Sequence, residues 1–203
     1  MLQSPYPQLI LASASRARSS VLAGAGLSFQ VEAARVDEAA VKQSARAEGA
    51  GVDETALILA ELKAGRVSER VPEALVIGAD QILVCEGAWF DKPADLPAAW
   101  TQLLALRGKT HVLSTAVVVQ RRGQRLWQHV ARPRLTMREF TDAFLDAYLA
   151  AEQVRLLTSV GAYRLEGRGV HLFEQIEGDY SAILGLPLLP LLAFLRQHGM
   201  ILE

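Results

Sequence analysis

The stretch Val76-Ile77-Gly78-Ala79-Asp80-Gln81 places a carboxylate directly after a short hydrophobic run. Val76 and Ile77 predict a short buried strand, because β-branched residues suit a pleated core position. Such a strand would end at Asp80, and ligands often bind at the carboxyl ends of strands in an open α/β sheet. Gly78 permits a close backbone approach, and Asp80 could then face a metal-bound substrate. A strand followed by an ordinary Asp-containing turn is the alternative interpretation.

Two lysines stand in settings that favour a functional role. Lys63 falls on the apolar stripe of a helix expected from about Asp53 to Glu69, and a lysine on that side must extend to solvent or meet an anion. Lys92 precedes Pro93, which fixes the backbone and helps to aim the amine. The residues that form the apolar stripe around Lys63 are Ala56, Leu59, Ala60, Ala64 and Val67.

Hydroxyl and basic side chains gather where a predicted strand, Gln8 to Ser13, gives way to a short helix. Ser13, Ser15 and Arg18, together with free helix N–H groups, could form an anion site. An ordinary serine N-cap explains the same residues, and both interpretations stay open.

Asp37 and Glu38 open a further predicted helix that runs to about Ala47. Acids in a first helical turn usually interact with the helix dipole, so these two residues alone do not indicate a site.

Composition excludes several classes of function. The chain has 203 residues, 51% hydrophobic residues, and 21 Lys plus Arg against 22 Asp plus Glu, so nothing predicts a nucleic acid or an anionic membrane as a partner. The single cysteine, Cys85, lies in an apolar run and is expected to be buried and inert. His111 and His129 are isolated, which leaves zinc and catalytic-triad chemistry little support. With neither a signal peptide nor a long apolar segment, we expect a cytoplasmic protein.

Predicted strands and helices alternate along the chain without an internal repeat or a linker. This pattern favours an α/β fold with a mixed sheet, in a single domain that spans residues 1–203.

Several motifs occur together, in order, over nearly the whole chain, and their joint pattern closely resembles the Maf family. The motifs are Leu11-Ala12-Ser13-Ala14-Ser15 with Arg18, Val36-Asp37-Glu38, Leu59-Ala60 with Lys63-Ala64, Gly78-Ala79-Asp80-Gln81, Lys92-Pro93, Gly161-Ala162-Tyr163, Glu166-Gly167, Gly178-Asp179-Tyr180 and Gly185-Leu186-Pro187. The resemblance implies an α/β fold related to the inosine triphosphatases, with helices flanking a mixed sheet and two lobes around a central cleft. It also implies hydrolysis of a nucleoside triphosphate to the monophosphate and pyrophosphate, with a divalent cation such as Mg, Mn or Co.

The resemblance gives the candidate residues defined roles. Asp80 matches the family's proton acceptor, and a triphosphate with its cation needs further acids for metal and water and cations for the phosphate oxygens. The acids are Asp37, Glu38 and Asp80, the cations are Arg18, Lys63 and Lys92, and the phosphate-binding hydroxyls are Ser13 and Ser15.

Departures from the family pattern concern the base pocket. Arg16 replaces the usual proline of the first motif, and Ser159 stands where a lysine is common. Three positions that sort substrates in the family correspond to Ala17, Gln81 and Glu166. Gln81 and Glu166 match the 7-methyl-GTP branch and not the dTTP/UTP branch, whereas Ala17 matches neither.

An ionised Glu166 only accepts hydrogen bonds, so it suits the N1–H and N2–H₂ edge of guanine. The absence of a tryptophan at position 17 removes a stacking face and weakens the case for a cationic methylated base. We therefore expect a guanine-type or modified nucleotide, with 7-methyl-GTP first.

Other interpretations remain. The chain could be a dTTP/UTP pyrophosphatase of the same family, a non-catalytic nucleotide-binding regulator of septum formation, or a nucleic-acid-binding protein, although the balanced charge argues against the last. The partners expected are a nucleoside triphosphate and, as an open option, a second copy in a homodimer.

Overall fold

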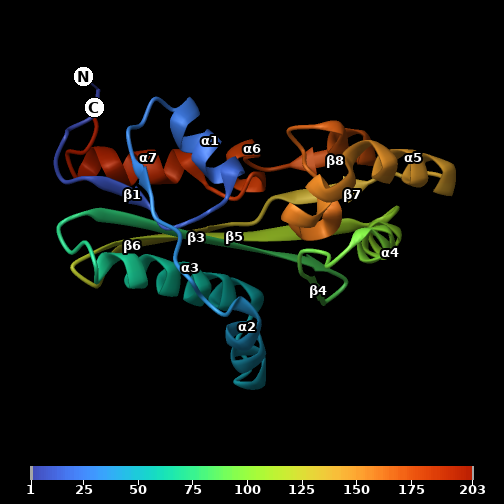
Figure 1. Cartoon of the computed structure of the whole chain (residues 1–203), viewed down its shortest axis with the longest axis horizontal. Coiled ribbons are helices and arrows are strands. Elements are labelled where there is room, and N and C mark those ends of the chain that lie inside the picture. Colours follow the sequence, from blue (N-terminus) through green and yellow to red (C-terminus); the bar gives the residue numbers. More distant parts are fainter. Residues whose placement is uncertain (1, 203) are drawn as a thin grey trace. The chain divides into compact units, whose positions relative to one another are not determined.

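The structure, a computed structural model, describes residues 2–202 and combines one mixed sheet with flanking helices (Figure 1). The strand order is β2-β1-β3-β5-β7-β8, with β4 paired to β3 and β6 paired to β5. Pairs β1–β2 and β1–β3 are parallel, whereas β3–β4, β5–β6, β5–β7 and β7–β8 are antiparallel. The strands are β1 Leu9–Leu11, β2 Gln30–Val31, β3 Leu75–Cys85, β4 Ala88–Phe90, β5 Thr110–Arg121, β6 Gln124–Ala131, β7 Arg134–Met137 and β8 Phe173–Glu177. The predicted α/β fold with a mixed sheet is confirmed.

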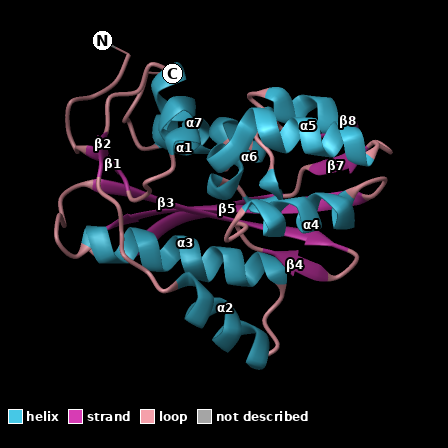
Figure 2. Cartoon of the chain, turned by 45° about the vertical axis from the view of Figure 1, so that its right-hand side comes forward, coloured by secondary structure: helices cyan, strands magenta, loops and turns pink. Residues whose placement is uncertain are grey.

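The helices occur largely where periodicity and capping residues predict them (Figure 2). Their bounds are α1 Arg16–Gly24, α2 Glu38–Ala47, α3 Val52–Ser68, α4 Leu96–Leu106, α5 Asp142–Glu152, α6 Tyr180–Ile183 and α7 Leu188–Gln197. Three short 3₁₀ segments, Gln153–Thr158, Val160–Ala162 and Arg168–Leu172, occupy the glycine-rich region before β8. Within the described residues, no helix is long and apolar enough to cross a membrane.

The chain divides into two compact units, in agreement with the two lobes expected. Unit 1 contains residues 2–80, Thr115–Ala131 and 180–202, and unit 2 contains Gln81–Ser114 and Arg132–Asp179. Strand β3 passes from unit 1 into unit 2 between Asp80 and Gln81, and β5 passes back between Ser114 and Thr115. The central cleft and the single-domain assignment stay predictions.

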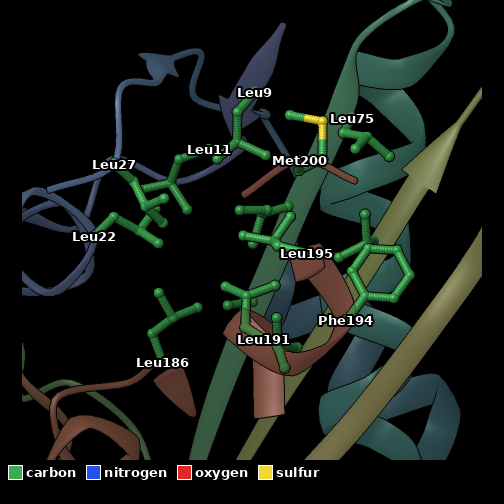
Figure 3. Close-up of a cluster of buried hydrophobic side chains, with 14 residues drawn as sticks. Leu9, Leu11, Leu22, Leu27, Leu75, Leu186, Leu191, Phe194, Leu195 and Met200 are labelled. Atoms are coloured by element: carbon green, nitrogen blue, oxygen red, sulfur yellow. The ribbon is translucent and has the colours of Figure 1, made fainter. Parts of the chain in front are cut away.

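The core of unit 1 forms on one face of its strands. Alternate β3 residues Leu75, Ile77 and Ala79 are buried against Leu191 and Phe194 of α7, as period-two alternation requires (Figure 3). Burying a leucine or isoleucine side chain such as Leu75 or Ile77 contributes about 1.5–3 kcal/mol. In both overall views of unit 1, α7 and α1 lie on one side of β3 and α3 lies on the other (Figures 1 and 2).

The prediction that the strand ends at Asp80 is wrong. Strand β3 continues to Cys85, so Asp80 lies in the middle of an 11-residue strand. The continuation is stabilised by burial of Ile82 and Leu83 and by antiparallel pairing of Leu83 with Phe90 on β4. The sequence marks no break, and apolar residues resume immediately after the Asp80-Gln81 pair.

Unit 2 buries polar side chains among aromatic ones. His111 on β5 is fully buried, its Nε2 lies 2.8 Å from the hydroxyl of Tyr163, and Phe173 packs against both rings. Cys85 is buried as predicted, and burial raises the pKa of its thiol, so the thiolate needed for nucleophilic attack is disfavoured.

Candidate active site

Helix α3 approaches strand β3 so closely that only glycine fits between them. A Cβ atom on Gly78 would lie 2.1 Å from the carbonyl oxygen of Ala60 and 2.9 Å from the Cβ of Ala64. Because side chains alternate along β3, Asp80 projects to the same face as Gly78. Gly78 and the two alanines therefore bring the Lys63 segment of α3 within reach of Asp80.

Lys63 joins the two acids of the site. Its Nζ lies 2.5 Å from Asp80 Oδ1 and 2.7 Å from Glu38 Oε1. Lys63 is 7% exposed and Asp80 is 4% exposed. Of the two alternatives for Lys63, extension to solvent or contact with an anion, the structure shows the second. Removing one partner from a buried pair of this kind typically costs about 3–5 kcal/mol, because the other charge is left uncompensated.

The second oxygen of Asp80 is incompletely satisfied. Asp80 Oδ2 is buried and has no hydrogen-bond partner among the described residues. A buried polar atom without a partner carries a desolvation cost of about 1–3 kcal/mol. A cation, a water molecule or a protonated ligand at Oδ2 would remove that cost.

Arg18 is held at two points on its guanidinium group. Its Nε donates to the backbone carbonyl of Gly185 at 2.8 Å, and its Nη1 donates to Ser13 Oγ at 3.0 Å. Burial lowers the pKa of the guanidinium, and the nearby carboxylates of Asp80 and Glu38 act in the opposite direction. Arg18 therefore lies in the electrostatic field of the same acids that Lys63 contacts.

The two serines have different local roles. Ser15 is the N-cap of α1, and its Oγ accepts a 3.4 Å hydrogen bond from Arg18 N, which confirms the N-cap interpretation. Ser13 Oγ accepts from Arg18 Nη1 and, at 3.3 Å, from the N–H of Ser15. A serine oxygen has two acceptor positions, so Ser13 retains its own O–H for donation to a ligand.

Asp37 acts locally as a cap. Its Oδ1 accepts a 3.1 Å hydrogen bond from the N–H of Ala40 and begins α2, while the next residue, Glu38, contacts Lys63. Among the described residues, no three His, Cys, Asp or Glu side chains form a ready metal site. Mg²⁺ is commonly held by one or two carboxylates together with substrate phosphates and water, so Glu38 and the unsatisfied Asp80 Oδ2 suit such an ion.

The remaining predicted site residues fall in different places. Ala17 is half-buried on α1 in unit 1. Gln81, Lys92 and Glu166 belong to unit 2, where Lys92 is exposed. Glu166 Oε1 accepts a 3.1 Å charged hydrogen bond from Arg164 Nε. Their joint role with the unit 1 residues stays a prediction.

Gly185 is the contact to Arg18 that sequence reasoning did not assign. It lies 167 positions from Arg18 in a Gly-Leu-Pro motif, and the contact uses a backbone oxygen. Side-chain chemistry gives no signal for such a residue. The motif itself was the only available indication.

The amino-acid sequence is similar to that of several known proteins. Residues 8–198 match the family described as Maf-like protein. A nucleoside triphosphate pyrophosphatase of Granulibacter bethesdensis is 60% identical over 191 residues, which cover 94% of this chain and 97% of the relative. One of Rhodospirillum rubrum is 53% identical, with 97% and 98% covered. A 7-methyl-GTP pyrophosphatase of Rhizobium johnstonii is 51% identical, with 96% and 98% covered.

Proposed function

Because the chain belongs to the Maf family, we propose that it hydrolyses a guanine-type nucleoside triphosphate, 7-methyl-GTP first among them, to the monophosphate and pyrophosphate. The general activity, a nucleoside triphosphate pyrophosphatase, is the one named for relatives at 60% and 53% identity. The observation that carries the proposal is the buried contact of Lys63 with Asp80 and Glu38, beside an Asp80 oxygen without a partner.

Each unit 1 residue has a defined part in the proposed reaction. A water molecule attacks the α-phosphorus, its proton passes to Asp80 Oδ2, and the bond from the α-phosphorus to the bridging oxygen breaks to release pyrophosphate. Lys63 fixes the orientation of Asp80 through Oδ1 and leaves Oδ2 toward the reaction. Arg18 and the Ser13 hydroxyl donate to phosphate oxygens whose negative charge increases in the transition state.

The proposal includes a divalent cation, Mg, Mn or Co. Glu38 would hold it, together with phosphate oxygens of the substrate, so that Asp80 Oδ2 stays available to accept the proton of the water. When bound, such an ion stabilises negative charge on the phosphate oxygens as a Lewis acid. Asp37, whose Oδ1 caps α2, would contribute through its second oxygen.

The choice of base rests on unit 2. The Glu166 carboxylate has one oxygen paired with Arg164, so its other oxygen can accept from the donor edge of guanine. Pyrimidine carbonyls are also acceptors, so they cannot form a hydrogen bond with this carboxylate. Relatives at 51% and 49% identity are named 7-methyl-GTP pyrophosphatases, which agrees with this preference.

The direct test is to identify the products formed from 7-methyl-GTP, GTP, dTTP and UTP, with and without excess EDTA. We expect pyrophosphate as the first product, no turnover in EDTA, and the guanine nucleotides as the preferred substrates. Orthophosphate as the first product, or full activity in EDTA, would contradict the pyrophosphatase mechanism. Equal turnover of dTTP or UTP would contradict only the choice of base and would support the dTTP/UTP alternative.

A further inference from the structure

The turn between α6 and α7 ends at a backbone carbonyl that contacts Arg18. Gly185 has φ of 96°, a left-handed conformation that favours glycine. In this conformation its carbonyl accepts from Arg18 Nε at 2.8 Å. A Cβ atom on Gly185 would lie 3.0 Å from the same Nε, so a side chain here would both strain the backbone and crowd Arg18.

The turn is itself fixed to the core of unit 1. The hydroxyl of Thr115 on β5 donates to the Ala182 carbonyl at 3.0 Å, in a buried position. The N–H of Gly185 donates to the same carbonyl at 3.0 Å, and Leu186 is fully buried in the hydrophobic cluster (Figure 3). The Gly185 carbonyl is therefore a rigid acceptor, because the residues on both sides of it are held.

The Gly185 carbonyl occupies only one of the N–H donors of Arg18. A guanidinium group has five N–H donors; Gly185 takes the one on Nε, and Ser13 takes one of the two on Nη1. For Nη2, no hydrogen-bond acceptor is present in the described part of the chain. Two fixed contacts determine the plane of the group, and three donors remain for an anion. Planar, bidentate recognition of phosphate requires this kind of orientation.

We propose that Gly185 is a positioning residue, whose carbonyl orients Arg18 toward the phosphate oxygens of the nucleotide and of the pyrophosphate product. The inference rests on the proposed function, because it assumes that Arg18 binds phosphate. Thr115 supports the same geometry indirectly, through the Ala182 carbonyl.

The test measures pyrophosphate binding by titration calorimetry in excess Mg²⁺, which requires no turnover. Gly185→Ala should weaken binding roughly tenfold or more, because the new methyl group would displace the guanidinium from the carbonyl and disturb a hydrogen bond to a charged group. Gly199→Ala is the matched control, because Gly199 also follows a helix of unit 1 with positive φ, 66°, but has nothing within 4 Å of its Cβ position. It should leave binding unchanged while it carries similar backbone strain.

A second set of variants separates positioning from general damage. Lysine has no Nε donor in the guanidinium geometry, so in an Arg18→Lys background Gly185→Ala should have little further effect. Thr115→Val preserves side-chain volume and should weaken pyrophosphate binding a few-fold, again only when Arg18 is present. If Gly185→Ala does not fold, Thr115→Val measured in both backgrounds decides the question.

The outcomes are distinct. Equal losses for Gly185→Ala and Gly199→Ala, or losses that persist undiminished in the Arg18→Lys background, would overturn the positioning role alone. A wild-type protein that binds no pyrophosphate would overturn the assignment of Arg18 in the proposed function, and this inference with it.

Discussion

Unit 1 and unit 2 each bury a set of titratable side chains, and the two sets differ in what faces them. In unit 1, Lys63 faces the carboxylates of Asp80 and Glu38 at 2.5 and 2.7 Å. In unit 2, His111 faces the hydroxyl of Tyr163 and the ring of Phe173. Burial lowers the pKa of His111 to about 4 and raises the pKa of Tyr163, so both groups are neutral at pH 7.

The difference shows two ways in which a buried titratable side chain is accommodated. A buried group without an opposite charge becomes neutral and serves packing and hydrogen bonding. A buried group with an opposite charge can stay ionised, and such a site can bind a phosphate or a cation. The buried His111 and Tyr163 of unit 2 therefore serve structure, whereas the buried Lys63 and Asp80 of unit 1 serve the proposed chemistry. Unit 2 also holds the buried carboxylate of Glu152, which pairs with Arg168 at 3.0 Å.

The largest expected effect comes from the acid of unit 1. Asp80→Asn keeps the shape and one oxygen but removes the proton acceptor, so turnover should fall by about 10²–10⁴-fold, as for other general bases. Nucleotide binding should remain, which equilibrium binding and steady-state kinetics would measure separately. Asp146→Asn, at an exposed position hydrogen-bonded to Trp100 in unit 2, is the control. Wild-type turnover in Asp80→Asn would refute the assignment.

Removing the charge of Lys63 should destabilise the fold, because the buried Asp80 would lose its ion-pair partner. Lys63→Met leaves Asp80 without its ion-pair partner, and we expect a loss of about 3–5 kcal/mol in the free energy of unfolding. Lys109→Met is the matched control, because Lys109 pairs with Glu86 at 2.7 Å but lies at the surface, where solvent screens the pair and its contribution to stability is small. Denaturant unfolding at pH 7 measures both. Equal losses in the two variants would break the comparison between buried and exposed pairs.

The neutral set of unit 2 predicts a dependence of stability on pH. The pKa of His111 is about 4 in the folded protein and about 6.5 when unfolded, so the unfolded chain binds more protons between these values. The contribution of His111 is therefore complete above pH 6.5 and is lost as the pH falls toward 4. The loss amounts to roughly 3 kcal/mol, because each pKa unit corresponds to about 1.4 kcal/mol.

His111→Gln, whose amide can still reach Tyr163, should remove this part of the acid sensitivity. The measurement is the free energy of unfolding at pH 7 and pH 4.5 for the wild type and the variant. His171→Gln, at an exposed position of unit 2, should retain the wild-type pH profile. Parallel profiles for wild type and His111→Gln would show that His111 is not buried in its neutral form.

The sequence predicts those parts of the site that depend on local pattern. Lys63 stands out because an apolar stripe places it toward the core, and the structure shows that the anions it meets are Asp80 and Glu38. The serine N-cap interpretation is confirmed for Ser15, because a cap accepts from an N–H three residues further on. Asp37, expected only to interact with the helix dipole, is the N-cap of α2. These predictions need no knowledge of the rest of the fold.

Features that depend on distant partners were not predictable in this way. The continuity of β3 through Asp80 was missed, because the Asp80-Gln81 pair looks like a turn although the strand runs unbroken from Leu75 to Cys85. The contact between Gly185 and Arg18 involves a backbone oxygen 167 positions away. The partnership of His111 with Tyr163 likewise spans 52 positions, so His111 looks isolated in the sequence.

The smallest expected effect concerns the choice of base. Glu166→Gln replaces an acceptor-only carboxylate with an amide that can also donate, and it removes the ion pair with Arg164. A mismatched polar partner costs roughly 1–3 kcal/mol, so the preference for 7-methyl-GTP over dTTP should narrow by about ten- to hundred-fold in kcat/KM. Dependence on the divalent cation should not change, because Glu166 is not among the proposed metal ligands. Glu174→Gln makes the same chemical change at an exposed position on β8 and should leave the ratio as in the wild type. If Glu166→Gln lowers turnover of all nucleotides equally, Glu166 contributes to catalysis and not to selection, and the functional division between the two units fails.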